Sequence, residues 1–196
     1  MLESDDHNDL HHSTLQLSGG GLGIKPGSIC ITERALDPLF QDFVELKICM
    51  QLVKRPCVID METAKKLESL CRAHPNHEEL GNYEVHLGAT VASNDFYEEQ
   101  GRTTGAICEH TLEEKMKFLE RARELGVINM EMECNHLAAM CHKLNVSFGI
   151  IDVSLANRLD NDKVELTREQ MSIFERRLFW SVHLFVRAKL SDGKVN

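Results

Sequence analysis

Hydrophobic residues recur every three or four positions in three segments of the chain, and this spacing predicts helices over residues 61–73, 111–126 and 167–190. The segment 111–126 has the clearest boundaries, because Thr111 and Glu114 match a capping box and Gly126 can end the helix. Its predicted buried stripe consists of Leu112, Met116, Leu119 and Ala122. A further helix is predicted over residues 134–144.

Alternating patterns and short apolar runs predict strands between these helices. Residues 83–93 alternate between apolar and polar side chains, as a half-buried strand does. Shorter apolar runs predict strands over residues 28–32, 127–133 and 146–156. The glycine-rich stretch 18–28 predicts a turn before the first of them. Because strands alternate with helices, the sequence predicts an α/β domain.

One acidic residue interrupts the most apolar of these strands. Asp152 stands in the middle of "GIIDVS", where a buried carboxylate without a partner would be costly. Three kinds of partner are open: a histidine, the N-terminus of a helix, or a contact in an oligomer.

Composition places the chain among ordinary globular proteins. It has 196 residues, 42% of them hydrophobic and 27% charged, which is enough for one domain with a substantial core. Residues 1–13 are acidic and polar and predict a disordered leader, so we assign the domain to residues 14–196. The net charge of −9 argues against nucleic acid or an anionic membrane as a partner, and no apolar run reaches the length of a membrane span.

The seven cysteines indicate a reduced, intracellular protein, and we expect a cytoplasmic location. Their number is odd, no pair has C-x-x-C spacing, and most stand in apolar surroundings. The histidines that lie outside the apolar segments, such as His74, His77 and His110, fit solvated loops better than a zinc site. The sequence therefore predicts no metal site.

The stretch "DFYEEQGR", Asp95 to Arg102, combines an aromatic pair, an amide and an arginine within eight residues. Phe96 can stack on a planar ring, while Gln100 and Arg102 can read a donor and acceptor edge such as that of uracil. The alternative is a bulged surface loop with a solvated arginine.

A second candidate is "EME" at the end of the predicted strand 127–133. If the strand persists, Glu131 and Glu133 point to one side and Met132 to the other. Two close carboxylates need partners, and the neighbouring hydroxyls of a sugar would provide them. The alternative, which spacing alone favours, is that one glutamate caps the following helix.

The third candidate is Arg158 in "NRLDND", which follows the predicted strand 146–156. An arginine at the end of a strand can orient a neighbouring amide or carboxylate. The equally weighted alternative is a loop arginine paired with Asp160 or Asp162.

Together these segments resemble the uridine phosphorylases of the nucleoside phosphorylase-I superfamily. The resemblance runs from about Ser18 to Leu190 and rests on four segments in the family's order: "SGGGLG…KPGSICIT", "DFYEEQGR", "GVINMEMECNHLAAMC" and "VSLANRLDND". It implies a nucleoside-phosphorylase-like mixed sheet, curled into a partial barrel and flanked by helices.

The resemblance also implies roles at the base. Gln100 and Arg102 match the pair that reads the uracil edge, Phe96 matches the ring that stacks on the base, and Arg158 matches the arginine that supports this pair. The family reaction is phosphorolysis of uridine to uracil and ribose 1-phosphate. It uses phosphate as a co-substrate and needs no metal or organic cofactor. Gln100 and Arg102 are implied to be catalytic, because they would meet negative charge on the leaving base.

At the sugar, the resemblance implies that Met132 and Glu133 contact the ribose. Glu133 would accept from the ribose hydroxyls and is the third implied catalytic residue, and Glu131 matches the acid that precedes them.

The phosphate end departs from the family pattern. Family members are longer at the N-terminus, so the resemblance implies that the first strands of the sheet and most phosphate ligands are missing. Where the family has an arginine before its glycine turn, this chain has Leu15 or Gln16, neither of which can pair with a dianion. Ser18 is the one hydroxyl left as a phosphate-contacting candidate.

Two interpretations of this departure are open. The chain is either a truncated form of an active pentosyltransferase, or a catalytically inactive protein that binds pyrimidine nucleosides or another subunit. A nucleoside hydrolase is disfavoured, because no acid or metal cluster is placed to activate water. An incomplete sheet exposes an edge and an apolar face, so we expect a homo-oligomer or pairing with a full-length subunit.

Overall fold

The structure is a computed structural model of the chain, and it describes residues 12–18, 20–74, 76–77, 79–160 and 163–192. Side chains are described throughout these ranges except at residues 12–18, 76–77 and 192.

The fold is built on a mixed six-stranded sheet in the order β1-β10-β3-β8-β9-β2. The strands are β1 (His12–Ser18), β2 (Gly20–Gly21), β3 (Ile29–Leu36), β8 (Val85–Ala92), β9 (Val127–Glu131) and β10 (Phe148–Ser154). β1 and β10 pair in parallel, as do β3 with β8 and β8 with β9, whereas β10 with β3 and β2 with β9 are antiparallel. The sheet thus has the mixed character expected of the fold.

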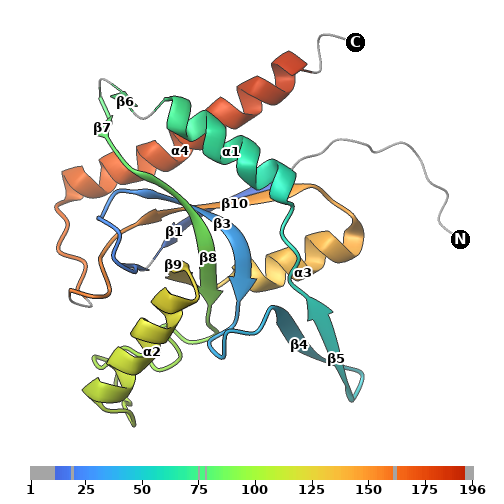
Figure 1. The fold of residues 1–196 in the computed structure, drawn as a ribbon, viewed down its shortest axis with the longest axis vertical. Coiled ribbons are helices and arrows are strands. Elements are labelled where there is room, and N and C mark those ends of the chain that lie inside the picture. The colour runs from blue at the N-terminus through green and yellow to red at the C-terminus, as the bar shows by residue number, and fades with distance from the viewer. Residues whose placement is uncertain (1–11, 19, 75, 78, 161–162, 193–196) are drawn as a thin grey trace, which may run out of the picture.

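Four helices flank the sheet, and two short hairpins project from it. The helices are α1 (Met61–Ala73), α2 (Leu112–Glu124), α3 (Cys134–Leu144) and α4 (Arg168–Asp192). α1 packs against α4, and both share one core with α3, whereas α2 packs on a second cluster with β8 and β9. In Figure 1, α1 and α4 lie at the top and α2 at the lower left. The hairpins are β4 (Phe43–Ile48) with β5 (Gln51–Pro56), and β6 (Asn76–His77) with β7 (Gly81–Asn82).

The sheet curls into a half-barrel, which Figure 1 shows in the strong bend of β3 and β8. Contacts between strands that are not neighbours in the sheet hold this curvature. The backbone N–H of Gly21 on β2 donates to Ala156 O, just beyond β10, at 2.8 Å. The side chain of Asn129 on β9 donates to Asp152 on β10 at 3.0 Å. The ends of β2, β9 and β10 are therefore brought together, although β3 and β8 separate β9 from β10 in the sheet.

Two clusters of buried hydrophobic residues fill the space around the sheet. The larger lies between the sheet and α1, α3 and α4, and includes Ile31, Leu67, Ala138, Ile151 and Phe185. The smaller lies between α2 and strands β8 and β9, and includes Val91, Leu119, Ala122, Val127 and Met130. Both clusters pack against the strands whose ends carry the candidate residues.

The helix predictions are confirmed with boundaries close to those expected. Helix α1 spans residues 61–73 as predicted, and Thr111 and Glu114 form the capping box of α2. Leu119 and Ala122 are buried on α2, but the prediction was wrong for Leu112, which is 65% exposed. Leu112 is the first residue of the helix, so it projects beyond the end of the packed surface.

The predicted strands are present in the structure, but some of them end at residues other than those predicted. β3 extends to Leu36 instead of ending at residue 32, through a bulge between Thr32 and Arg34 that accommodates its charged residues. β9 ends at Glu131, two residues earlier than predicted.

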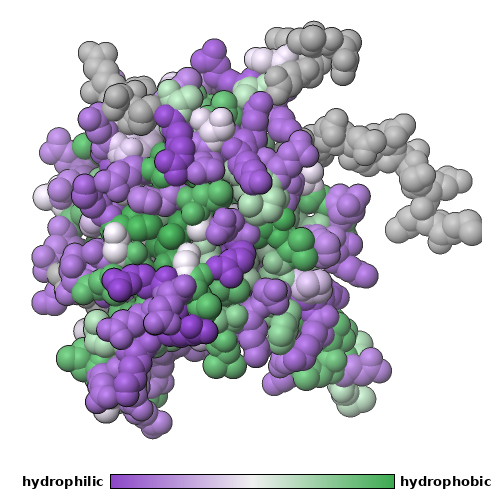
Figure 2. Space-filling model, in the orientation of Figure 1, coloured by the Kyte–Doolittle hydropathy of each residue, from purple (hydrophilic) through white to green (hydrophobic). Residues whose placement is uncertain are grey.

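The β4–β5 hairpin was not predicted. Its turn residues, Cys49 and Met50, both have positive φ, at 48° and 65°. Glycine, asparagine and aspartate usually mark such turns, and none of them is present here. The apolar tip is exposed: Met50 is fully exposed and Leu52 is 60% exposed, and Figure 2 shows this hydrophobic patch at the lower right.

The predicted leader divides into two parts. Residues 1–11 lie outside the described residues, so the prediction is not tested there. His12 and Ser13 belong to β1, where they pair with Phe148 and Gly149, so this strand begins inside the range assigned to the leader. Their polar side chains gave no sign of a strand, because the pairing is set by a partner more than 130 residues away.

All seven cysteines are free thiols; Cys49 and Cys108 are exposed and the other five are buried. Within the described part of the chain, no helix combines the length and apolar character needed to cross a membrane.

Candidate functional site

The loop after β8 is folded by its own acidic side chains. The Asp95 carboxylate accepts hydrogen bonds from the backbone N–H groups of Tyr97, Glu98 and Glu99. The Glu99 carboxylate accepts in turn from the N–H groups of Asn94 and Asp95. These bonds hold the loop in a compact turn, and the next residues enter the interior from it.

Gln100 and Arg102 are buried, at 1% and 2% exposure. Gly101 between them has φ of +65°, a conformation that few other residues adopt without strain. The Gln100 amide nitrogen donates to Ser93 Oγ at 3.0 Å and to Glu131 O at 3.4 Å. The alternative of a bulged loop with a solvated arginine is therefore wrong, because both polar side chains point inward.

Phe96 lies beside Arg102 at the surface of this loop. The Arg102 guanidinium carbon is 4.1 Å from the centre of the Phe96 ring, and Tyr97 meets the same ring edge-on at 5.2 Å. Phe96 is 39% exposed. Phe96, Gln100 and Arg102 thus lie close together, and the Phe96 ring stacks on the Arg102 guanidinium.

Arg158 supports this arrangement from the opposite side. It is 1% exposed, and its Nη2 donates to Gln100 O at 2.6 Å, while Nη1 lies 3.5 Å from the Met130 sulfur. Gly20 makes room for it, because a Cβ at Gly20 would lie 2.5 Å from the Arg158 side chain. Arg158 is thus no solvated loop arginine. The Asp160 carboxylate accepts from Asn157 Nδ2, and Asp162, the other partner considered, lies outside the described residues.

Glu131 caps helix α3 from the end of β9. Its carboxylate accepts from the backbone N–H of Glu133 at 2.8 Å and of Cys134 at 3.0 Å. Burial raises the pKa of Glu131 above its ordinary value, and the hydrogen bonds from Cys134 and Glu133 N–H oppose this shift. The alternative of a helix-capping glutamate is therefore correct for Glu131.

Glu133 and Met132 remain exposed beside this cap. Glu133 is the N-cap residue of α3, but its side chain makes no capping hydrogen bond. Because β9 ends at Glu131, the strand alternation predicted for Glu131, Met132 and Glu133 does not occur. The chain turns at this point, so Glu131 becomes a buried cap and Glu133 stays exposed. The Glu133 side chain still lies beside the Glu131 carboxyl and adds to the rise in the pKa of Glu131.

Asp152 has a partner that the sequence did not indicate. It is fully buried, and Asn129 Nδ2 donates to its Oδ2 at 3.0 Å. Burial, reinforced by the charges of Glu131 and Glu133, raises the pKa of Asp152 well above its ordinary value. Among the described residues, this partner is neither a histidine nor a helix N-terminus.

Ser18, the phosphate-contacting candidate, is the last residue of β1 and pairs with Ser154 of β10. Its side chain lies outside the description. Next to it, the glycine turn is bound closely to β10, since Gly21 N–H also donates to Ser154 Oγ at 3.2 Å. A Cβ at Gly21 would lie 2.8 Å from this oxygen.

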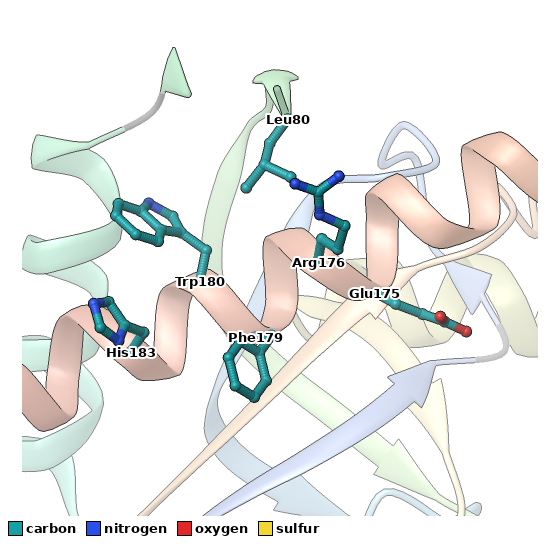
Figure 3. A pocket seen from close by; sticks show the side chains of 6 residues that line it. All are labelled: Leu80, Glu175, Arg176, Phe179, Trp180 and His183. Carbon is teal, nitrogen blue, oxygen red and sulfur yellow. The ribbon is translucent and has the colours of Figure 1, made fainter. Parts of the chain in front are cut away.

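A separate apolar hollow of about 520 Å³ lies along α4, away from these residues. It is lined by Leu80, Glu175, Arg176, Phe179, Trp180 and His183, which Figure 3 shows around the helix. None of the candidate residues lines it.

The structure therefore brings together the three segments that the sequence singled out. Gln100 is the link, because it contacts Glu131 O through its side chain and Arg158 through its backbone carbonyl. The supporting residues Ser93, Asn129 and Met130 were not predicted. The first two are polar residues within apolar strands, which is the one signal that could have indicated them.

Comparison with known proteins places the chain among phosphorylases. The family model of the phosphorylase superfamily matches residues 18–181. Uridine phosphorylase A of Schistosoma mansoni is 35% identical over 161 residues, covering 82% of this chain and 52% of its own. Human uridine phosphorylase 2 is 34% identical over 173 residues, covering 88% of this chain and 53% of its own. The chain thus spans about half the length of these curated relatives.

Solved structures extend the comparison to the fold. Uridine phosphorylase from Schistosoma mansoni in complex with thymine has a TM-score of 0.84 and 32% identity, covering 92% of this chain and 62% of its own. A uridine phosphorylase of the oomycete Phytophthora capsici has a TM-score of 0.83 and 34% identity, covering 93% of this chain and 59% of its own. The chain therefore belongs to the phosphorylase superfamily.

Proposed function

We propose that this chain binds the base and ribose of a pyrimidine nucleoside, as part of a uridine phosphorylase. Gln100 and Arg102 read the uracil edge, and Phe96 contributes an aromatic surface beside them. Arg158 fixes the backbone of Gln100 from behind. The substrate pair is uridine and phosphate, and the products are uracil and ribose 1-phosphate.

The observation that carries this proposal is the orientation of the Gln100 amide. Its nitrogen is held by Ser93 Oγ and Glu131 O, while its oxygen is buried and has no donor among the described residues. A buried acceptor without a donor is costly, and a ligand N–H would satisfy it. The N3–H of uracil supplies such a donor, and its carbonyl oxygens can accept from Arg102.

Glu133 is the proposed ribose contact. Its exposed carboxylate makes no capping bond to α3, so it is available to accept from the 2′ and 3′ hydroxyls. Glu131 leaves it available by capping the helix instead. Met132, which is 36% exposed, lies between them and offers an apolar surface to the sugar.

In the proposed reaction, a phosphate oxygen attacks C1′ of uridine while the bond between C1′ and N1 breaks. The bonding electron pair leaves with the base, so negative charge grows on the uracil ring. Arg102 stabilises this charge by donating to a ring oxygen. The reaction needs neither a metal nor an organic cofactor, and Ser18 is the proposed phosphate contact of this chain.

We further propose that the protein acts in the cytoplasm as a homo-oligomer or together with a full-length subunit. The exposed apolar tip of the β4–β5 hairpin supports association, because such surfaces are usually covered.

Binding without turnover is the second candidate function. One relative, named inactive uridine phosphorylase B of Schistosoma mansoni, is 33% identical over 157 residues, covering 80% of this chain and 51% of its own. Loss of turnover within the family supports this alternative.

The test is uracil release from uridine by the purified chain, with and without phosphate, alongside calorimetric titration with uridine. Phosphate-dependent release supports the phosphorylase, and binding without release supports the second candidate. Gln100→Leu is expected to weaken uridine binding at least tenfold, because it removes the buried acceptor. Undiminished binding by a folded Gln100→Leu variant would exclude the proposed recognition of uracil.

A further inference from the structure

Asp152 is a fully buried acid that the proposed reaction does not use. Its Oδ2 accepts from Asn129 Nδ2 at 3.0 Å, and its Oδ1 has no hydrogen-bond partner among the described residues. An acid with one amide partner in a core strand lowers stability unless it is uncharged. Its presence there calls for a role other than packing.

The bond between Asn129 and Asp152 crosses the concave side of the half-barrel. The two residues belong to β9 and β10, which β8 and β3 separate in the sheet. β9 and β10 do not pair with each other; β2 links only their ends, through Gly21. The side-chain bond is therefore a direct link between the two strands.

This link leads to the ribose end of the site. Asn129 and Glu131 are two residues apart on β9 and therefore point to the same face. Glu131 binds the N–H groups of Glu133 and Cys134 at the start of α3. A displacement of Asn129 would move Glu131, and with it the exposed carboxylate of Glu133.

The titratable neighbours of Asp152 are acids and thiols. Cys30 pairs with it in register on β3, and Cys134 lies at the start of α3. Glu131 and Glu133 act on it electrostatically from the end of β9 and the start of α3. Its register partner on β1 is Gln16, which carries no charge. These surroundings disfavour a negative charge at Asp152 and favour its protonated form.

We propose that Asp152 is a positioning residue for the ribose end of the site: in its uncharged form it holds Asn129, and through β9 and Glu131 it fixes the start of α3. Ionisation of Asp152 places a third negative charge beside Glu131 and Glu133 and loosens the first turn of α3. The effect on nucleoside binding rests on the proposed function, whereas the effect on α3 does not.

The test compares wild type with Asp152→Asn, which keeps an uncharged acceptor, and Asp152→Ala, which removes it. Amide hydrogen exchange at Glu133 and Cys134 is measured at pH 5 and pH 9 and corrected for intrinsic rates. The first turn of α2 serves as an internal control. Asp60→Asn, an acid-to-amide change at the N-cap of α1, is the matched control variant.

We expect the wild type to lose at least tenfold protection at Cys134 between pH 5 and pH 9. Asp152→Asn should keep its protection at both values, and Asp152→Ala should lose it at both. The first turn of α2 should show no such loss. Asp60→Asn keeps Asp152, so it should lose protection at Cys134 as the wild type does. If protection at Cys134 depends on pH equally in the wild type and in Asp152→Asn, the proposal is overturned. This comparison tests the proposal even if Asp152→Ala does not fold.

Thermal unfolding gives an independent readout. Because the folded chain holds the Asp152 proton to higher pH than the unfolded chain, this residue makes the free energy of unfolding fall as pH rises above about 4. Asp152→Asn should reduce that fall, so its melting temperature should exceed that of the wild type increasingly from pH 5 to pH 8. A constant difference over this range would count against the uncharged form.

Calorimetric titration with uridine at the same pH values separates this proposal from the proposed function. Wild-type affinity should weaken at least threefold from pH 5 to pH 8, and Asp152→Asn should weaken less. If no variant binds uridine while the exchange pattern holds, the nucleoside site is rejected and the positioning of α3 stands.

Discussion

Helices α2 and α3 begin in contrasting ways, although both have glutamates near their first turn. α2 is capped by its own N-cap residue: Thr111 Oγ1 accepts from Glu114 N–H at 3.2 Å, and the Glu114 carboxylate accepts from Thr111 N–H at 2.8 Å. α3 is capped by Glu131, two residues before its N-cap, and the N-cap residue Glu133 makes no side-chain capping bond.

The difference shows how a helix start becomes available to a ligand. In α2 the exposed capping groups hydrogen-bond to each other, so neither of them is available to a ligand. In α3 the buried Glu131 on the preceding strand accepts from the backbone N–H groups. The exposed Glu133 at the N-cap therefore has no capping role and can bind a ligand. The first arrangement stabilises a helix locally, and the second couples the helix to the sheet and to the proposed ribose site.

The largest effect is expected from removing the buried cap. Glu131→Ala leaves the N–H groups of Glu133 and Cys134 without their acceptor, so the free energy of unfolding should fall by about 2–3 kcal/mol. Denaturant unfolding measures the change. A loss below about 0.5 kcal/mol would mean that water replaces the carboxylate and that α3 does not depend on β9 for its cap.

A smaller effect, on binding instead of stability, is expected at the exposed acid. Glu133→Ala should weaken uridine binding about 10-fold to 100-fold, because a charged acceptor of the ribose hydroxyls is lost. Its free energy of unfolding should stay within about 0.5 kcal/mol of wild type, because the side chain caps nothing. Titration calorimetry measures the affinity and denaturant unfolding of the same sample measures the stability. Loss of stability without loss of binding would mean that Glu133 supports the helix and does not contact the ribose.

The smallest effect is expected at α2. Thr111→Ala removes the local cap and should lower the free energy of unfolding by about 1 kcal/mol. Uridine affinity should not change, because Thr111 and Glu114 bond to each other and, among the described residues, to none of the candidate residues. A clear change in affinity would show that α2 also positions the site.

Local patterns allowed the helices and the grouping of the candidate residues to be predicted. The spacing around Leu119 and the Thr111–Glu114 pair is contained within a few residues, so the elements follow from the chain itself. The grouping of Phe96, Gln100 and Arg102 in one loop likewise indicates a site for a planar polar ligand, because all three side chains lie within seven consecutive positions.

Features that depend on distant partners were not predictable. The burial of Arg158 requires Gly20 beside it and Gln100 O as an acceptor, which lie 138 and 58 positions away in the sequence. The β4–β5 turn adopts positive φ at two residues that rarely do so. The end of β9 is decided by the cap that Glu131 provides, and the strand pattern continues past it.

The sequence by itself thus determined the α/β class, the four helices and the grouping of Phe96, Gln100 and Arg102 that we propose as the uracil site. Helical spacing, capping and side-chain chemistry are local properties. Only the tertiary structure decided that Glu131 supports the site while Glu133 faces outward, and that Asp152 is held by Asn129. Both depend on the curling of the sheet, which brings β9 and β10 together across strands that lie between them. A hydrogen bond forms between atoms that are close in space, and the order of residues along the chain does not state which atoms those are.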